Sequence, residues 1–159
     1  MTIDCHIKFD EVEGESTDDG HDKEISVLNW SWGVASPANQ TNGGLSVGQP
    51  MPHELTFEHG YDKASPTLAK MCVDGKHFDS VVLTSRKSGA GPQDFLKITM
   101  KNAFITGVMP RGRQGGEVTE VVSLMYKDIE HSYKPQKSGG GEVDAEVKTG
   151  WDLQTKKTR

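Results

Sequence analysis

Residues 25–33 read I-S-V-L-N-W-S-W-G, and they carry the clearest secondary-structure signal in the chain. Large apolar side chains recur at every second position, which is the period of a β-strand with one buried face. The alternation puts Leu28, Trp30 and Trp32 on one face and Val27, Asn29 and Ser31 on the other. Tryptophans that follow such a period belong to the core of a β fold more often than to a binding surface. We therefore predict a strand whose tryptophans point inward.

The same two-residue period recurs along the rest of the chain. It predicts strands at 3–9, 53–59, 95–105, 119–133 and 143–153, and residues 78–87 are predicted as a further strand because they are rich in β-forming residues. The residues predicted to point inward are Ile3, Cys5, Ile7, Phe9, Leu55, Phe57, Leu96, Ile98, Met100, Phe104, Val122, Leu124, Tyr126, Ile129, Tyr133, Val143, Ala145, Val147, Thr149, Trp151 and Leu153. The residues between them, His6 included, are predicted to face water.

A single helix is predicted among these strands, at about residues 66–74. Ser65 can cap its N-terminus, Pro66 suits its first position and Gly75 can close its end. Its apolar stripe is formed by Leu68, Ala69, Met71 and Cys72. The length of the chain fits a single domain over residues 1–159. The pattern predicts a mainly β domain of about seven or eight antiparallel strands and this helix, closed into a barrel or a sandwich.

Glycine-rich segments separate the predicted strands, as a fold with many turns requires. They cover 34–52, 88–94, 107–117 and 134–141, and we predict loops there. Residues 10–24 form a further long polar segment, D-E-V-E-G-E-S-T-D-D-G-H-D-K-E, without an apolar period. A loop of this length in a compact domain is usually functional or disordered.

The composition excludes several classes of protein. The 18 basic and 23 acidic residues leave a net charge of −5, whereas nucleic-acid binders normally carry a basic surface. No apolar run approaches the ~18 residues that a membrane-spanning helix needs, so membrane insertion is not expected. No apolar segment follows a basic start, so a cleaved signal peptide is not expected either. Cys5 and Cys72 are too few for a disulfide scaffold.

The sequence offers no pattern that anchors catalysis or a metal. The histidines lie in separate segments without the i, i+4 spacing of a zinc site, at His6, His21, His53, His59, His77 and His131. Neither a phosphate-binding P-loop nor a G-x-S-x-G motif occurs. We therefore expect no enzyme activity, no cofactor and no metal. Two rivals to a structural role stay open: a β-sandwich carbohydrate-binding module that uses exposed tryptophans, and a small β-barrel hydrolase.

Several separated motifs resemble one family, the haemolysin-coregulated proteins (Hcp), which are tube subunits of the bacterial type VI secretion system. The matching segments are I-K-F-D-E-V-E-G-E-S (7–16), H-D-K-E-I-S-V-L-N-W-S-W-G (21–33), D-K-A-S-P-T-L (62–68), G-K-H-F (75–78), Y-K-P-Q-K (133–137) and G-W-D-L (150–153). They occur in the family's order and cover essentially the whole chain.

The resemblance implies a fold and an assembly. The family fold is a β-barrel of two antiparallel sheets with one short flanking α-helix, here at about 66–74. Six copies form a ring with a wide channel, and the rings stack into a tube inside a contractile sheath, capped by a spike protein. Small effector proteins travel in the channel. The resemblance thus implies a homo-hexamer that is cytoplasmic before firing and is then secreted without a cleaved signal peptide.

Two sets of functional residues are expected from this resemblance. Asn29 and Ser31 lie on the strand that lines the channel, opposite the tryptophans, and are expected to contact effectors. Glu15 and Ser16 belong to the long polar segment 10–24, which is expected to reach a neighbouring subunit or the next ring.

Overall fold

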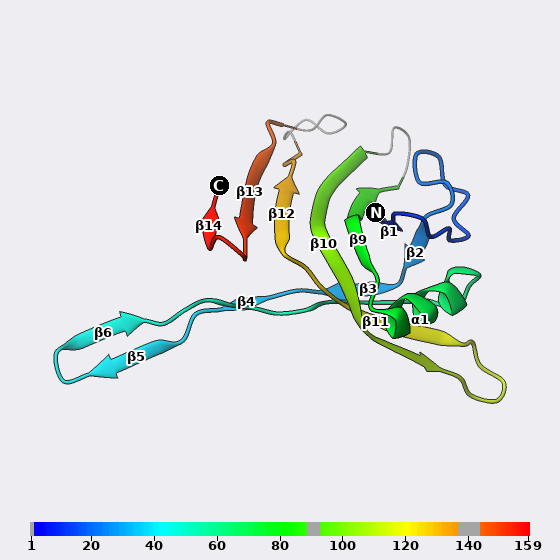
Figure 1. Ribbon diagram of the computed structural model, residues 1–159. Coiled ribbons are helices and arrows are strands. Elements are labelled where there is room, and N and C mark those ends of the chain that lie inside the picture. Colours follow the sequence, from blue (N-terminus) through cyan, green and yellow to red (C-terminus); the bar gives the residue numbers. More distant parts are fainter. Residues whose placement is uncertain (1, 89–92, 137–143) are drawn as a thin grey trace.

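The computed structural model describes residues 2–88, 93–136 and 144–159. Figure 1 shows a curved β-sheet body with a helix beside it and a narrow hairpin that projects away from it. The elements are β1 (Ile3–Phe9), β2 (Ile25–Val27), β3 (Asn29–Ser31), β4 (Val34–Ala35), β5 (Ala38–Thr41), β6 (Gly44–Val47), β7 (Met51–Pro52), β8 (Leu55–Gly60), α1 (Ala64–Asp74), β9 (His77–Lys87), β10 (Gln93–Arg111), β11 (Thr119–Met125), β12 (Asp128–Tyr133), β13 (Val147–Asp152) and β14 (Lys157–Thr158). The predicted fold class, mainly β with one short helix, is confirmed for the described residues.

The body is one antiparallel sheet of ten strands, and β10 is its central strand. The first part of β10 pairs with β9 on one side and β12 on the other, whereas its last part pairs with β11. From β10 the sheet continues through β12 and β13 to β14, through β11 and β8 to β3, and through β9 and β1 to β2. It thus divides at β10 into two halves around one core. Among the described strands β3 and β14 do not pair with each other, so the predicted barrel is an open one.

The core joins both halves of the sheet. Ten of the predicted inward residues are buried in it, namely Ile7, Phe9, Leu55, Phe57, Ile98, Met100, Val122, Leu124, Tyr126 and Ile129. At its centre the ring of Phe9 lies 5.1 Å from that of Phe78 and 6.1 Å from that of Phe57. Each side chain of this size contributes roughly 1.5–3 kcal/mol when it is fully buried. The three rings come from β1, β9 and β8, so this cluster connects the two halves.

The stretch predicted as one strand at 25–33 begins as two short strands with a bend between them. β2 pairs with β1, whereas β3 pairs with β8. Leu28 lies at the bend, where its N–H donates to the carbonyl oxygen of Glu58 at 2.8 Å. The change of partner reverses the alternation, so Val27 is buried and Leu28 is 63% exposed. The predicted orientations of Val27 and Leu28 were therefore wrong.

Two further residues that were predicted to point inward, Phe104 and Tyr133, are not fully buried. Asn102 in β10 has a left-handed φ of 48°, and beyond it the buried residues are Ala103 and Ile105. Phe104 is consequently only half-buried. Tyr133 is exposed because it lies at the end of β12.

Residues at the margins of the sheet are less buried than their alternation predicted. Ile3, Ala145, Val147 and Thr149 are exposed, and Cys5, Leu96, Trp151 and Leu153 are half-buried. Three of them, Val147, Thr149 and Trp151, belong to β13, whose outer neighbour among the described strands is the two-residue β14. Val143 lies outside the described residues, as do parts of the predicted loops 88–94 and 134–141.

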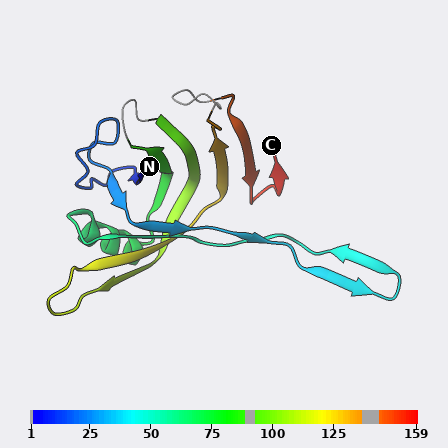
Figure 2. The same cartoon turned by 180° about the vertical axis from the view of Figure 1, so that it is seen from behind.

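The segment 34–52, predicted as a loop, is a hairpin arm. Its base is the pair β4–β7 and its tip is the pair β5–β6. Figure 2 shows from behind that the arm runs well clear of the body. Asn42 and Gly43 connect the two tip strands, and Asn-Gly is a strong signal for a two-residue hairpin turn. The loop predicted at 107–117 is also shorter than expected, since β10 continues to Arg111.

The helix begins earlier than predicted because a different residue accepts its free N–H groups. The carboxylate of Asp62 accepts the N–H of Ala64 at 2.9 Å, and the hydroxyl of Ser65 accepts the N–H of Asp62 at 3.1 Å. Ser65 thus lies inside the helix and is not its cap. The end is as predicted, since Gly75 has a left-handed φ of 64°. Leu68 is buried beneath the helix.

A buried ionic group lies where β8 leads into the helix. His59 and Glu120 are cross-strand neighbours, and His59 Nε2 lies 3.0 Å from Glu120 Oε1. His59 Nδ1 lies 3.7 Å from Asp62 Oδ2. Burial alone would lower the pKa of His59, but the carboxylates of Asp62 and Glu120 outweigh it and raise the pKa above the usual 6.5. The contacts of His59 with Glu120 and Asp62 are therefore most favourable when the ring of His59 is protonated.

This raised pKa predicts that the protein loses stability as the pH rises. The contribution of His59 is fully present below its unfolded pKa of about 6.5 and is lost as the pH passes its folded pKa. The free energy of unfolding, measured by urea denaturation, should decrease between pH 6 and pH 9. His59→Gln should make this decrease shallower, and the same change at the exposed His77 should not. An equally steep decrease in His59→Gln would contradict the assignment.

Candidate functional site

The residues predicted to contact effectors lie on an exposed polar surface. Asn29 and Ser31 are exposed on β3, which is an edge strand of the second half of the sheet. The register pairs Asn29 with Glu58 and Ser31 with Thr56 of β8, and Thr56 with Ser123 of β11. We call these five residues the polar face. They lie on the side of the sheet opposite the core residues of β8 and β11.

Hydrogen bonds connect the polar face across its strands. Asn29 Nδ2 donates to Glu58 Oε2 at 2.8 Å, and the hydroxyls of Thr56 and Ser123 lie 3.4 Å apart. The hydrogen bond from Asn29 lowers the pKa of Glu58, and Thr119 and the nearby cation of Arg111 lower it further. Glu58 therefore stays ionised and is held in place by its neighbours.

Ser31 differs from its neighbours on the polar face. Its side chain is exposed, and among the described residues its hydroxyl has no hydrogen-bond partner. A hydroxyl can both donate and accept. Ser31 is therefore the member of the polar face that is free to bind another molecule, while Asn29 is already bonded to Glu58.

The tryptophans pack against the core. Trp30, Trp32 and Trp151 are half-buried and all contact the core cluster. The indole N–H of Trp32 donates to the hydroxyl of Tyr126 at 2.5 Å, and its ring lies 4.4 Å from that of His131. The structural role predicted for the tryptophans is confirmed, although they are less buried than expected. This packing gives no support to the carbohydrate-binding alternative.

The predicted contact residues Glu15 and Ser16 differ in exposure. Glu15 is exposed, whereas Ser16 is buried within the loop 10–24, where its hydroxyl accepts the N–H of Asp18 at 3.2 Å. The loop packs on its own chain and covers His6, which is therefore buried and does not face water as predicted. The contact of Glu15 and Ser16 with another subunit stays a prediction.

The hairpin arm is a candidate interaction surface that the sequence reasoning missed. Leu45 is 81% exposed and Val47 is 78% exposed, and the two follow each other on one face of β6. Val34 and Met51 at the base are also exposed. The Asn-Gly turn between two short strands could have identified the hairpin, but the surrounding glycine and polar residues favoured a loop.

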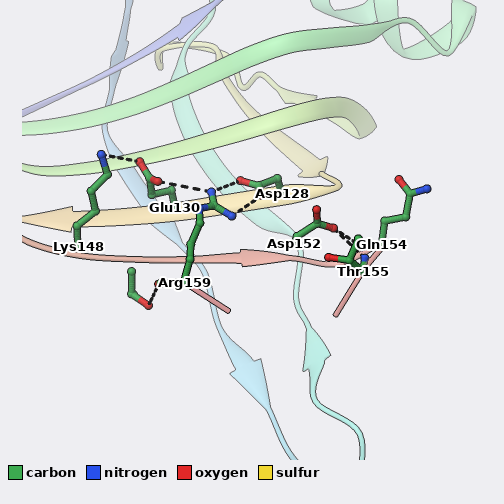
Figure 3. A network of polar contacts seen from close by, with 8 residues as sticks. Asp128, Glu130, Lys148, Asp152, Gln154, Thr155 and Arg159 are labelled. Carbon is green, nitrogen blue, oxygen red and sulfur yellow. Dashed lines mark hydrogen bonds and ion pairs between the residues drawn. The ribbon is translucent and has the colours of Figure 1, made fainter. Parts of the chain in front are cut away.

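An ion-pair network joins Arg159, directly after β14, and Lys148 of β13 to Asp128 and Glu130 of β12 (Figure 3). Both Nη atoms of Arg159 lie 2.7 Å from the carboxylate of Asp128, and Lys148 Nζ lies 3.2 Å from Glu130. The backbone of Arg159 exchanges two hydrogen bonds with Gly150, at 2.9 and 3.0 Å. Exposed ion pairs are screened by solvent and each contributes little to stability. The network therefore helps to hold the end of the chain against the sheet.

The described residues contain no group of three or more His, Cys, Asp or Glu side chains placed to hold a metal ion. The thiol of Cys5 lies 3.1 Å from the hydroxyl of Ser85. Within the described part of the chain, no helix is both long enough and apolar enough to cross a bilayer.

Comparisons with known proteins agree on a single family. Residues 6–133 match the family described as "Type VI secretion system effector, Hcp". The chain is 38% identical over 157 residues to "Protein hcp1" of Pseudomonas aeruginosa, which covers 96% of each chain. A solved type six secretion system protein superposes with a TM-score of 0.93 at 30% identity, covering 99% of this chain and 100% of the other. Hcp1 from Salmonella typhimurium superposes with a TM-score of 0.79 at 32% identity over the whole of both chains.

The polar face yields a test of its own geometry. Removing the amide in Asn29→Ala should raise the pKa of Glu58 toward its usual 4.5, because the largest cause of the lowering is lost. Ser31→Ala is the matched control, since its hydroxyl makes no bond to Glu58, and it should leave that pKa unchanged. Carboxyl-carbon NMR titration of Glu58 measures both. An unchanged pKa in Asn29→Ala would mean that the hydrogen bond does not form in solution.

Proposed function

The chain belongs to the Hcp family of type VI secretion system proteins, and we propose that it is the ring-forming subunit of a secretion tube. Family membership makes it a secreted structural component of that system. In the proposal, six copies close into a ring and the rings stack into a tube. The tube meets a spike protein at its end and a contractile sheath around it. The protein is cytoplasmic until contraction exports it, and small effectors travel inside.

The hairpin arm is the main observation that supports this proposal. It extends away from the body and exposes Leu45 and Val47 on strands that pair only with each other. An isolated two-stranded hairpin is marginally stable in water, and exposed apolar side chains on a projecting element indicate a protein partner. A second copy of the chain is the partner that the family supports. Heterologous contacts of this kind close into a ring when the rotation between copies permits.

The open edges of the sheet support the same proposal. The edge strand β3 presents unpaired backbone groups beside the exposed Leu28. Such edges favour association unless another element covers them. A neighbouring subunit that packs along this edge would cover it, and the exposed Glu15 of the loop 10–24 is available for a further contact.

The polar face is the surface that we propose for the channel wall. Its groups are small, and apart from Glu58 they are uncharged, which suits weak hydrogen bonding to varied protein cargo rather than one tight ligand. Ser31 has a free hydroxyl and Asn29 is exposed beside it, so these two residues are the proposed effector contacts.

The first test concerns assembly through the arm. The wild-type protein should appear as six-fold rings by electron microscopy and as a hexamer by light scattering. Leu45→Asp should abolish the rings, because it places a charge in the apolar contact, and it should leave the melting temperature within a few degrees of wild type.

The control for this test lies next to the variant. Ser46→Asp adds the same charge to the opposite face of β6 and should leave most rings intact. A wild-type protein that stays monomeric over a wide concentration range would overturn the proposal. If Leu45→Asp forms normal rings, the arm is not the contact between subunits, but the proposal that the chain forms rings still stands.

The second test concerns cargo. Ser31→Gln should keep the ring, since nothing in the core changes, and should lower the amount of small effector that co-purifies by crowding the channel wall. Ser46→Gln, on the arm, is the control. The measurement compares bound effector for rings of equal assembly state. Equal retention across several effectors would remove Ser31 from the cargo surface.

A further inference from the structure

The tip of the hairpin arm contains the one Asn-Gly pair of the chain, Asn42–Gly43. The pair connects β5 to β6, and every residue from 38 to 47 is exposed. The two strands pair only with each other and not with the main sheet. Elements with few buried contacts open locally at little cost in free energy. Asn42 and Gly43 therefore lie in water, on an element that the main sheet does not hold in place.

The turn lacks the geometry that would hold these two residues in one conformation. Neither Asn42 nor Gly43 has a positive φ, whereas Gly44 has a φ of 146°. A type I′ turn, which matches the twist of the flanking strands, requires a positive φ at both central residues. Among the described residues, neither the side-chain amide of Asn42 nor the N–H of Gly43 has a hydrogen-bond partner. The two groups are thus free to approach each other.

These two groups can react without any catalyst. Hydroxide removes the proton from the backbone nitrogen of Gly43, and this nitrogen attacks Cγ of Asn42. The new C–N bond closes a succinimide ring, and the bond to the side-chain nitrogen breaks. That nitrogen takes a proton from water and leaves as ammonia, which regenerates hydroxide. The reaction is intramolecular, so no second molecule has to be positioned.

Water then opens the ring at either of its two carbonyl carbons. One C–N bond of the ring breaks, and the carbon that loses nitrogen becomes a carboxylate. The product at position 42 is aspartate or isoaspartate, depending on the carbonyl attacked. The overall change consumes one water and releases one ammonia, and nothing is oxidised or reduced.

The residue after Asn42 distinguishes it from the other asparagines. A Cβ added to Gly43 would meet nothing within 4 Å, so the space around the attacking nitrogen is open. Glycine itself adds no side chain to hinder the approach. The other three asparagines are each followed by a residue with a side chain, and they are Asn29, Asn39 and Asn102. Asn39 lies in the same exposed arm and is therefore an internal control.

Either product changes the chemistry of the arm. Residues 34–52 carry no charged side chain, although 26% of the whole chain is charged, so the reaction gives this segment its first charge. The new carboxylate lies at the tip, near the exposed Leu45 in sequence. Isoaspartate also lengthens the backbone of the turn by one methylene, because the chain then runs through the former side chain. A charge that has to leave water opposes an apolar contact through the arm.

We propose that Asn42 is a site of spontaneous deamidation in the folded chain, and that a chain modified there associates less well through the arm. The reaction therefore sets a time limit on a free subunit. The deamidation itself is independent of the proposed function, whereas its effect on association rests on it.

Peptide mass mapping of the full chain tests the deamidation. Wild type and Leu45→Asp, which is expected to stay unassembled, are incubated for days at pH 6 and at pH 8.5 and then digested. The peptide that contains Asn42 should gain the mass that replacing NH2 by OH produces. The rate should rise with the hydroxide concentration, because the attacking nitrogen must lose its proton. Fragment spectra should place the change at Asn42 and leave Asn39 unmodified, and an isoaspartate-specific methyltransferase should label the aged protein.

The variant Gly43→Ala should suppress the reaction and keep the arm. Its Cβ has room, and Gly43 has no positive φ, so alanine fits the turn. The added methyl group hinders ring closure. Most of the modification should therefore be lost, while fresh protein assembles as wild type does. Gln40→Ala is the matched control, since it adds alanine to the same arm and leaves the Asn-Gly pair intact, and it should deamidate as fast as wild type.

Light scattering measures the effect on association. Wild type that is aged as dilute protein and then concentrated should form fewer rings than fresh wild type. Gly43→Ala, treated in the same way, should form as many rings as its fresh sample. Asn42→Asp carries the charge from the start and should form fewer rings even when fresh.

The outcomes separate this proposal from the proposed function. Absence of the modified peptide from both wild type and Leu45→Asp would overturn it, whether or not the chain forms rings. Equal modification of Asn39 and Asn42 would also overturn it, because Gly43 would then play no part. Modified chains that assemble as well as fresh ones would overturn the effect on association. A chain that forms no rings at all would overturn that effect together with the proposed function, while the deamidation is still measured directly.

Discussion

The pairing of β10 with three different strands is the constraint on which the rest of the body depends. Because its first part bonds to β9 and β12 and its last part to β11, this one strand belongs to both halves of the sheet. Its direction must change between them, and the chain provides two local irregularities there. These are the left-handed Asn102 and the shift of register between Ile105 and Gly107. Extra residues of this kind bend a strand and increase its twist.

This bend determines which residues the proposed effector surface contains. It turns β11, β8 and β3 so that Phe57, Val122 and Leu124 close the core, and the alternate residues of the same strands form the polar face. The polar face is thus a consequence of the core on its other side. The buried His59 and Glu120 lie at the end of this inner face, and His59 lies 3.7 Å from Asp62, just before the helix.

Sequence patterns predicted those parts of the fold in which a strand keeps the same neighbours along its length. Leu55 and Phe57 alternate as expected because β8 lies between β3 and β11. The prediction that Leu28 points inward failed because the two-residue period of a strand does not reveal that the strand changes its pairing partner. The prediction that His6 faces water failed for another reason. A polar residue on the outer face of the sheet becomes buried when a loop from elsewhere in the chain covers it. Sequence alone could not have paired His21 with Asp94, since the fold brings together residues that are 73 positions apart.

In the proposed assembly, the length of the hairpin arm affects how fast two copies of the chain associate. Residues 34–42 form one side of it, and an extended chain advances about 3.3 Å per residue, so the arm reaches roughly 30 Å from its base. A compact domain of this chain length has a radius of gyration of about 15 Å, so the reach of the arm is about twice that radius. It enlarges the target that a second copy meets by diffusion, and the first collision can occur at Leu45 before the two bodies touch. Later contacts then form between tethered molecules, at a local concentration that the length of the arm fixes.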